Sequence, residues 1–279
     1  MNNEQGRVAV ITGAASGIGR GLAEHAAGLG IRLVLADRDE TKLQTLCAAL
    51  QESGAQAIAC VTDVSDLAQV ERLRDVALDH FGAVDLLFNN AGVMQTGYSW
   101  EITAEQWQRM LNVNLNGVIN GIRSFVPFLL RQGRPAHVIN TASLAGLLSS
   151  PLMAPYNVTK QAVVALSETL HYELAMLGAP VAVSVICPGP VASEIMASNQ
   201  VADAAGSSFS ELLDSSIRHG MTPGELAAQV FAAIDEKRFW VLPHKGFEAA
   251  LQRRVQSILE EFNPQFQMSD VEGNAHAAR

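Results

Sequence analysis

A tyrosine and a lysine four residues apart have the types and spacing that most directly suggest chemistry in this 279-residue chain. Tyr156 and Lys160 open a stretch with helical periodicity that reaches Leu177, before Gly178 and Pro180 end it. Positions i and i+4 share one face of a helix, so the phenol and the ammonium can point into one site. A free tyrosine has a pKa of about 10, and a nearby positive charge lowers it. The pair is a candidate for general acid–base catalysis, although this spacing alone is common in structural helices.

A glycine-rich turn near the N-terminus predicts a binding site for the phosphates of a dinucleotide. It reads Thr12-Gly13-Ala14-Ala15-Ser16-Gly17-Ile18-Gly19 and lies between a first strand and a helical stretch, Arg20–Leu29. Glycines let the backbone approach a pyrophosphate, and the helix N-terminus beyond them offers free N–H groups and a positive dipole. An ordinary tight turn is the alternative, but the position between strand and helix favours the dinucleotide. The residues expected there are Gly13, Ser16, Gly17, Ile18 and Gly19.

Two charged residues after the second predicted strand bear on the choice of cofactor. Asp37 ends that strand, and a carboxylate there can accept hydrogen bonds from both adenosine ribose hydroxyls while repelling a 2′-phosphate. Asp39 fits the N-cap of the next helix instead. Arg38 leaves the question open, because a guanidinium beside the ribose can hold a phosphate. We therefore expect NAD, with NADP as the alternative.

Short apolar runs that alternate with longer helical stretches indicate which elements position these residues. Continuous apolar runs are expected for strands whose two faces are both covered by helices. The alternation predicts an α/β fold: a single domain with a doubly wound parallel sheet of Rossmann type and helices on both faces. The predicted strands are Val8–Ile11, Leu33–Ala36, Ala57–Val61, Leu86–Asn89, His137–Asn140 and Val181–Ile186, with Phe239–Leu242 as a late edge strand.

Two segments depart from this alternation of strands and helices. The domain is expected to span residues 1–262, and within it residues 193–220 are rich in Ser and Ala with weak periodicity. A segment of this kind between a strand and a helix suggests a lid over the site. Residues 263–279 are polar, with Pro264 and Gly273, and are expected to form a loosely held tail.

Charge and composition limit the partners. The chain has 19 Lys plus Arg against 28 Asp plus Glu, a formal net charge of −9, and no basic run. Nucleic acid and anionic membranes both need clustered positive charge, so neither is an expected partner. There is no apolar run of about 18 residues to span a bilayer, and the first residues lack the pattern of a signal peptide. We expect a cytoplasmic protein.

The cysteines and histidines do not suggest a metal site. Cys47, Cys60 and Cys187 show no metal-like spacing and are expected to be reduced and buried. The histidines after the catalytic pair also lack ligand spacing, so surface or supporting roles are expected for them and no metal is expected. They are His171, His219 and His244.

Taken together, the motifs resemble the short-chain dehydrogenase/reductase family in its compact single-domain branch, from about Arg7 to Val191. Ser193 departs from the family pattern, which has threonine at this position, but it keeps the hydroxyl. The matching elements beyond those described above are Asp63-Val64, Asn89-Asn90-Ala91-Gly92, Asn114 with Gly117, Ser143, and the loop Pro188-Gly189-Pro190-Val191-Ala192-Ser193.

The resemblance implies a role for each matching residue. Tyr156 would exchange the proton of the alcohol, Ser143 would stabilise charge on the reacting oxygen, and Lys160 would lower the Tyr156 pKa and hold the nicotinamide ribose. Asn114 would hold a water that connects Lys160 to solvent. As alternatives, Ser143 could be a satisfied loop hydroxyl and Asn114 a helix-kink residue. The further cofactor contacts implied are Asp63, Val64, Asn90, Ala91, Gly92, Pro188, Gly189, Val191 and Ser193.

The resemblance also implies a small-molecule substrate and an oligomer. The implied pocket residues are mostly apolar, which favours a bulky hydrophobic or aromatic secondary alcohol or ketone. The helical stretches Glu105–Leu130 and Tyr156–Leu177 are apolar on more than one face, and similar proteins pair such helices in homodimers or homotetramers. The implied pocket residues are Met94, Gln95, Ala145, Leu147, Met153 and Pro190.

Two other functions remain open. A reductase of carrier-bound 3-oxoacyl groups would need basic residues near the mouth of the site, and Arg131 and Arg134 are scattered candidates. A catalytically silent nucleotide-binding module is the other alternative, which the intact Ser143, Tyr156 and Lys160 disfavour.

Overall fold

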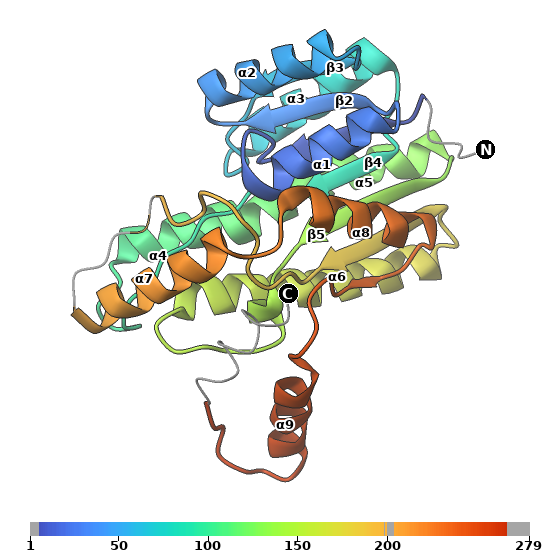
Figure 1. Cartoon of the computed structure of the whole chain (residues 1–279). Helices are drawn as coiled ribbons and strands as arrows, with labels where there is room; N and C mark the ends of the chain where they lie inside the picture. The colour runs from blue at the N-terminus through green and yellow to red at the C-terminus, as the bar shows by residue number, and fades with distance from the viewer. Residues whose placement is uncertain (1–5, 198, 200–203, 267–279) are drawn as a thin grey trace.

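The computed structural model describes residues 6–197, 199 and 204–266, and a seven-stranded parallel sheet forms its centre (Figure 1). The strand order is β3-β2-β1-β4-β5-β6-β7, so the direction of winding reverses between β1 and β4. This is the predicted doubly wound fold. The strands are β1 (Val8–Thr12), β2 (Arg32–Asp37), β3 (Ala57–Val61), β4 (Leu86–Asn89), β5 (Ala136–Thr141), β6 (Val181–Ile186) and β7 (Trp240–Val241).

Helices cover both faces of the sheet, which explains why the strands are almost wholly buried. One layer packs α1 (Gly17–Gly28), α2 (Glu40–Glu52) and α8 (Pro223–Asp235) on the sheet. The other packs α3 (Leu67–Phe81), α5 (Gly117–Gln132) and α6 (Ala154–Met176).

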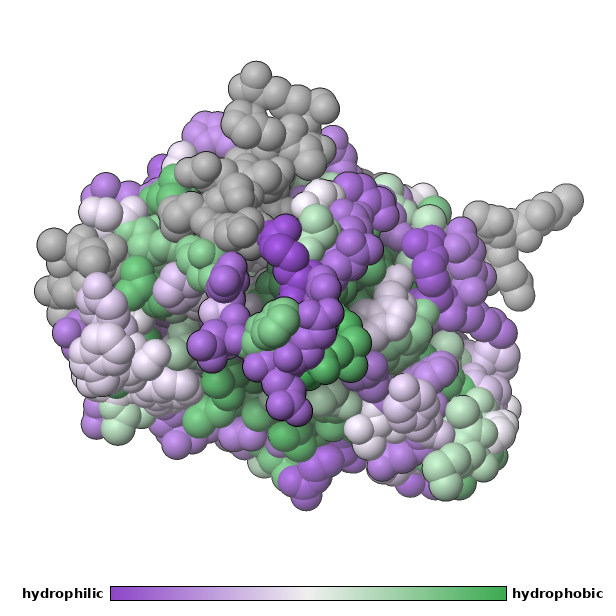
Figure 2. Space-filling model, turned by 90° about the horizontal axis from the view of Figure 1, so that it is seen from below, coloured by the Kyte–Doolittle hydropathy of each residue, from purple (hydrophilic) through white to green (hydrophobic). Residues whose placement is uncertain are grey.

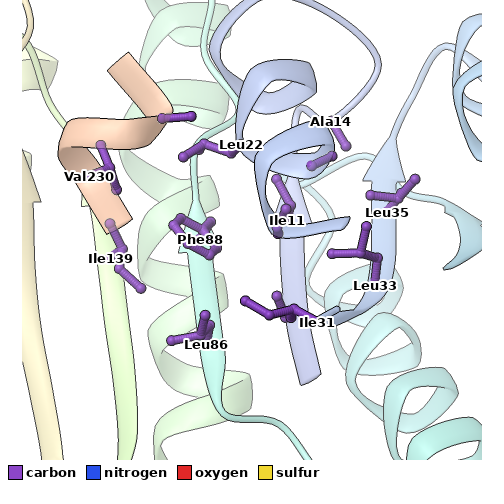
Figure 3. Close-up of a cluster of buried hydrophobic side chains, with 14 of the residues drawn as sticks. Ile11, Ala14, Leu22, Ile31, Leu33, Leu35, Leu86, Phe88, Ile139 and Val230 are labelled. Atoms are coloured by element: carbon purple, nitrogen blue, oxygen red, sulfur yellow. The ribbon is translucent and has the colours of Figure 1, made fainter. Parts of the chain in front are cut away.

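Alternate residues of each strand face opposite helix layers. In β1, Ile11 belongs to the same apolar cluster as Leu22 of α1 and Val230 of α8 (Figure 3), whereas Val8 and Val10 pack on the other layer. All five residues of β1 are buried. This alternation follows from the pleat of a strand and fixes the sheet between two apolar cores.

The carboxyl ends of β1 and β4 are tied together at the point where the winding reverses. The Thr12 hydroxyl donates to the carbonyl of Phe88 and accepts from the amide N–H of Asn90. The Asn90 side chain in turn donates to the carbonyl of Thr12 at 3.0 Å. Ligands bind at such a reversal in open α/β sheets, and these bonds hold the two loops that border it.

The remaining helical segments surround this end of the sheet. The predicted stretch Glu105–Leu130 is continuous helix but is not uniform: α4 (Ala104–Met110) passes into a π-helical segment, Leu111–Asn116, and then into α5. A short 3₁₀ turn, Leu144–Gly146, precedes α6. Two further helices are α7 (Ala204–Arg218) and α9 (Glu248–Leu259), and α9 projects away from the body in Figure 1.

These two helices add detail that the sequence-based description did not contain. Residues 204–218, inside the segment with weak periodicity, form α7, because Phe209 and Ile217 bury their side chains on the body. We did not predict α9. Of the predicted tail, residues 263–266 are described, and the rest, like residues 198 and 200–203 of the predicted lid, lies outside the described residues.

Cys47, Cys60 and Cys187 are free and buried, as predicted.

Within residues 6–197, 199 and 204–266, no helix combines the length and the apolar character needed to cross a membrane.

Candidate active site

A cavity of about 1040 Å³ opens at the carboxyl ends of the strands and brings the predicted residues together. It runs from the glycine-rich turn and Asp37, past Ser143 and Tyr156, to α9. All predicted site residues line it except Gly19 and Asn114, which are buried behind its wall. The site residues predicted from the sequence thus form one continuous cavity wall, and Gly19 and Asn114 support it from behind.

The turn between β1 and α1 has the geometry that a pyrophosphate requires. Gly13 adopts a left-handed backbone with φ of 64°, which favours glycine. A Cβ on Gly19 would lie 2.0 Å from the carbonyl oxygen of Gly13, so no side chain fits there. Ser16 caps α1 without a side-chain hydrogen bond to its N–H groups. The cavity therefore meets a helix N-terminus with backbone donors left for an anion.

The adenosine end of the cavity combines a carboxylate with a guanidinium. Asp37 Oδ2 accepts from the backbone N–H of Ala15 at 3.0 Å, and Oδ1 accepts from that of Asp39, which orients the carboxylate into the cavity. Arg38 also lines the cavity, and its charge acts on Arg109 of α4, whose pKa is lowered first by burial and then by Arg38. Each carboxylate oxygen keeps a lone pair for a ribose hydroxyl.

Asp63 and Val64 complete this end through the turn after β3. Asp63 Oδ1 accepts from both the backbone N–H and the hydroxyl of Ser65, which closes the turn. Val64 is buried against Gly117, where a Cβ would lie 2.7 Å from the Val64 methyl. Asn120 of α5 donates to the Val64 carbonyl at 2.9 Å. These contacts fix the wall on which an adenine ring could rest.

Ser143, Tyr156 and Lys160 meet where β5, β6 and α6 approach one another. The Lys160 ammonium lies 5.6 Å from the centre of the Tyr156 ring and donates to the carbonyl of Thr141 at 2.8 Å. Ser143 caps the 3₁₀ turn, with its hydroxyl accepting from the Ala145 N–H, and it hydrogen-bonds Tyr156. Pro155 lies in the first turn of α6, where proline is favoured, and Tyr156, the next residue, lines the cavity.

The electrostatics of this centre differ from the expectation for tyrosine. Burial raises the pKa of Tyr156 to about 12, and the hydrogen bond with Ser143 offsets only part of that rise. Burial also lowers the pKa of Lys160 to about 8. Desolvation of the phenolate dominates, so these side chains alone do not give Tyr156 a lowered pKa. Additional positive charge in the cavity would be needed to lower it.

Asn114 supports the centre from the π-helical segment. Its side chain accepts from the N–H of Val93 at 2.8 Å, donates to the Val93 carbonyl at 2.9 Å and contacts the Thr159 hydroxyl. Oδ1 of Asn114 and Nζ of Lys160 both lie 3.6 Å from the position that a Cβ on Gly92 would take. The wider π turn brings Asn114 to the loop after β4 and to the lysine, and such turns are frequent at functional sites.

His244 was assigned only a surface or supporting role, and the structure gives it a specific one. It is buried, accepts from the Gly189 N–H through Nδ1 at 3.1 Å, and lies 3.0 Å from the Pro190 carbonyl through Nε2. The two contacts require the neutral tautomer with the proton on Nε2. Burial accordingly lowers the pKa of His244. The histidine thus fixes the loop after β6, whose residues Pro188, Gly189, Val191 and Ser193 line the cavity.

The other two histidines have ordinary environments. His171 packs against Tyr172 and Phe239, and the exposed His219 contacts the Ser215 carbonyl within α7.

An apolar cover lies over Tyr156. Phe209 and Ile217 of α7 pack in one cluster with Tyr156, Met94 and Met153. Both residues belong to the segment 193–220, for which a lid stays a prediction.

Two of the expected pocket residues are not part of the cavity wall. Gln95 is buried and turns to the backbone, with its amide donating to the Thr96 carbonyl. Leu147 uses its carbonyl to accept from Arg254 of α9. The other expected pocket residues, Met94, Ala145, Met153 and Pro190, line the cavity.

Comparisons with known proteins agree on one family. Its model, described as short chain dehydrogenase, matches residues 7–204. A short chain dehydrogenase/reductase structure from Burkholderia phymatum in complex with NAD is 42% identical, with a TM-score of 0.92 over 96% of this chain and 99% of that chain. The 1-deoxy-11-beta-hydroxypentalenate dehydrogenase of Streptomyces exfoliatus is 35% identical over 91% of this chain and 89% of its own length. The C alpha-dehydrogenase of Sphingobium sp. is 32% identical over 98% and 91%.

Proposed function

This chain belongs to the short-chain dehydrogenase/reductase family, and on that basis we propose that it interconverts a bulky secondary alcohol and the corresponding ketone with NAD as hydride carrier. The observation that carries the proposal is the meeting of Ser143, Tyr156 and Lys160 on one wall of the cavity that also reaches the glycine-rich turn. Proton transfer and dinucleotide binding can then occur in one space.

In this proposal each residue acts on a stated atom. Tyr156 takes the proton from the alcohol oxygen in oxidation and returns it in reduction. Ser143 donates to the same oxygen and stabilises the charge that develops on it. Lys160 is held by the Thr141 carbonyl and binds the ribose hydroxyls nearest the reacting centre. Asn114 holds the loop after β4 and positions a water beside Lys160 through which the site exchanges protons.

The residues present fit a dinucleotide. The left-handed Gly13, the uncapped N-terminus of α1 and the oriented Asp37 carboxylate provide for a pyrophosphate and an adenosine ribose. When bound, NAD accepts or supplies the hydride, and the positive charge of its oxidised ring favours the phenolate of Tyr156. NADP is the alternative, since Arg38 and Arg109 both lie on that side.

An apolar substrate is supported by the apolar cover over Tyr156. Met94, Met153, Phe209 and Ile217 surround the tyrosine, and none of them offers a charge to a phosphorylated or sugar-like substrate. The substrate of this chain is therefore a large apolar or aromatic carbinol in this proposal. The two relatives are named as dehydrogenases of 1-deoxy-11-beta-hydroxypentalenate and of a C alpha position.

A reductase of carrier-bound 3-oxoacyl groups receives less support. Arg134 forms an ion pair with Asp85, just before β4, and Arg131 is in the last turn of α5, just before β5. Both positions are at the amino ends of the strands, opposite the cavity. Neither arginine can therefore meet an acidic carrier at the mouth of the site.

A kinetic screen tests the proposal. Purified protein is assayed with NAD and NADP against secondary alcohols of graded size, aliphatic, alicyclic and aryl, and in reverse with the matching ketones. We expect turnover with NAD that rises with the apolar bulk around the carbinol. Absence of turnover with every alcohol and ketone, despite NAD binding, would favour the silent module instead.

A further inference from the structure

The far end of the cavity is built by a part of the chain outside the matched family region. Residues 7–204 match the family model, whereas α9 and residues 263–266 form the wall beyond Ser149 and Ser150. Figure 1 shows α9 standing apart from the layers of the fold, joined to them through the stretch after β7. The identity of the side chains at this end therefore bears on what distinguishes this chain within its family.

Two adjacent arginines, Arg253 and Arg254, face the cavity from α9. Arg254 is half-buried, and its Nη1 donates to the carbonyl of Leu147 at 3.0 Å. No carboxylate in the described part of the chain forms an ion pair with Arg254. A guanidinium carries five N–H donors, so the bond to Leu147 holds it in place and leaves most of them for a ligand.

The bond to Leu147 ties this charge to the turn that carries Ser143. Ser143 caps the start of the 3₁₀ turn and Leu147 caps its end, four positions further along the chain. Through the Leu147 carbonyl, the Arg254 guanidinium is therefore held at the short turn that begins with Ser143.

The two ends of the cavity carry opposite charges: carboxylates lie at the adenosine end, and arginine side chains of α9 lie at the other end. Among the described lining residues, the carboxylates are Asp37, Asp39 and Asp63 at the adenosine end, and Glu194, which pairs with Lys42. Arg254 forms an ion pair with none of these carboxylates. In a chain of net charge −9, such a site favours a single anionic group over a cation or a neutral polar one.

Apolar side chains fill the space between the catalytic centre and the arginines. Leu148 and Met153 line it from the body and Leu213 from α7, while Ile258 and Phe262 line it from α9 and its extension. Figure 2 views the molecule from the end at which α9 lies, and hydrophobic surface borders hydrophilic surface there. An occupant of this space needs an apolar middle with its polar groups at the two ends.

We propose that Arg254 binds a carboxylate of the substrate, so that this protein acts on apolar hydroxy or oxo acids. This inference rests on the proposed function and adds the substrate class. A planar guanidinium suits a carboxylate because it can form two parallel hydrogen bonds with it.

A keto acid and its methyl ester test the inference with the body of the ligand held constant. A suitable probe is cyclohexanone bearing a para-benzoic acid group on the carbon opposite the carbonyl. Binding of both compounds is measured by calorimetry on the NAD⁺-saturated protein, which cannot reduce a ketone, and their reduction is followed separately through NADH absorbance. The variants are Arg254→Gln and Arg254→Lys, with Arg72→Gln on the exposed side of α3 as a control of equal charge change.

We expect wild-type protein to bind the acid about ten to a hundred times more tightly than the ester, the range of a charge-assisted pair. Arg254→Gln should remove most of that preference, and Arg254→Lys should keep part of it. Arg72→Gln should leave it as in wild type. Equal affinity for acid and ester, absence of binding by both, or a preference that survives Arg254→Gln overturns the inference.

Turnover separates this inference from the proposed function. If the acid is preferred through Arg254 but neither compound is reduced, the anion site stands and the proposed activity fails on this substrate. If both compounds are reduced without discrimination, the activity stands and the anion site is wrong.

Discussion

At the level of a single residue, we predict that Asp37 decides cofactor choice. Its carboxylate lines the cavity and is oriented by the N–H groups of Ala15 and Asp39, and a carboxylate at the end of the second strand repels a 2′-phosphate. Contact between like charges in a partly solvated cleft costs on the order of 1–4 kcal/mol, roughly a ten- to several-hundredfold preference. We predict that wild type prefers NAD in kcat/KM and that Asp37→Ser shifts the preference toward NADP, helped by Arg38 and Arg109. Steady-state kinetics with both cofactors measures this, and a wild-type preference for NADP would show that the arginines control the site.

Single residues were predictable where the motif is local and missed where the contact spans the chain. Gly13, Tyr156 and Lys160 follow from spacing within one turn or one helix. Gly189 and His244 are 55 positions apart, and no periodicity reveals that one holds the other. The same is true of Arg254 and Leu147, which are 107 positions apart. Such pairs depend on how complete elements pack.

At the scale of elements, a buried histidine joins the last three strands. His137 of β5 lies 2.7 Å from the hydroxyl of Ser184 in β6, and that hydroxyl donates to the carbonyl of Arg238, just before β7. Burial lowers the pKa of His137 to about 4, from an ordinary value of 6.5. Between those pH values the unfolded chain binds a proton that the folded chain does not, so acid favours unfolding there.

We predict that the free energy of unfolding falls by about 3 kcal/mol through this group as the pH decreases from 6.5 to 4. The slope is half of its full value at pH 6.5, where half of the unfolded chains carry the proton, and it disappears about one to two pH units higher, where the histidine is neutral in both states. His137→Gln should make the pH dependence shallower in this range, and His219→Gln, at an exposed position, should not. Urea unfolding at a series of pH values measures the slope, and an unchanged slope in His137→Gln would refute the assignment.

The strands were predictable as elements because continuous apolar runs are required when both faces of a sheet are covered. The helices near the site were less predictable from the sequence. In α7, Phe209, Leu213 and Ile217 do recur at helical spacing, but the surrounding Ser and Ala residues weaken the signal. In α9 only Ala250 is buried, so the helix has little of the buried apolar face by which a sequence reveals a packed helix.

At the scale of the whole molecule, α6 presents an apolar stripe that the body does not cover. Val158, Tyr172 and Met176 are exposed by 49%, 61% and 86%, and they fall within about 40° of one another around the helix. We predict that two copies pair through this stripe, giving at least twice the chain mass of 29.8 kDa at micromolar concentration. Light scattering measures it. Tyr172→Glu should weaken the assembly and Thr45→Glu on α2 should not, and a monomer across the concentration range would remove the proposed interface.

The most direct test of the central claim compares wild type with Tyr156→Phe. The substitution keeps the ring that packs with Met94 and Met153 and removes only the hydroxyl proposed to transfer the proton. Turnover of the best alcohol is measured in parallel with NAD affinity. The account predicts unchanged NAD affinity and a fall in kcat of about 10²–10⁴-fold, the usual contribution of a general acid–base. A variant that kept more than about a tenth of wild-type turnover would contradict the role of Tyr156 and with it the proposed chemistry.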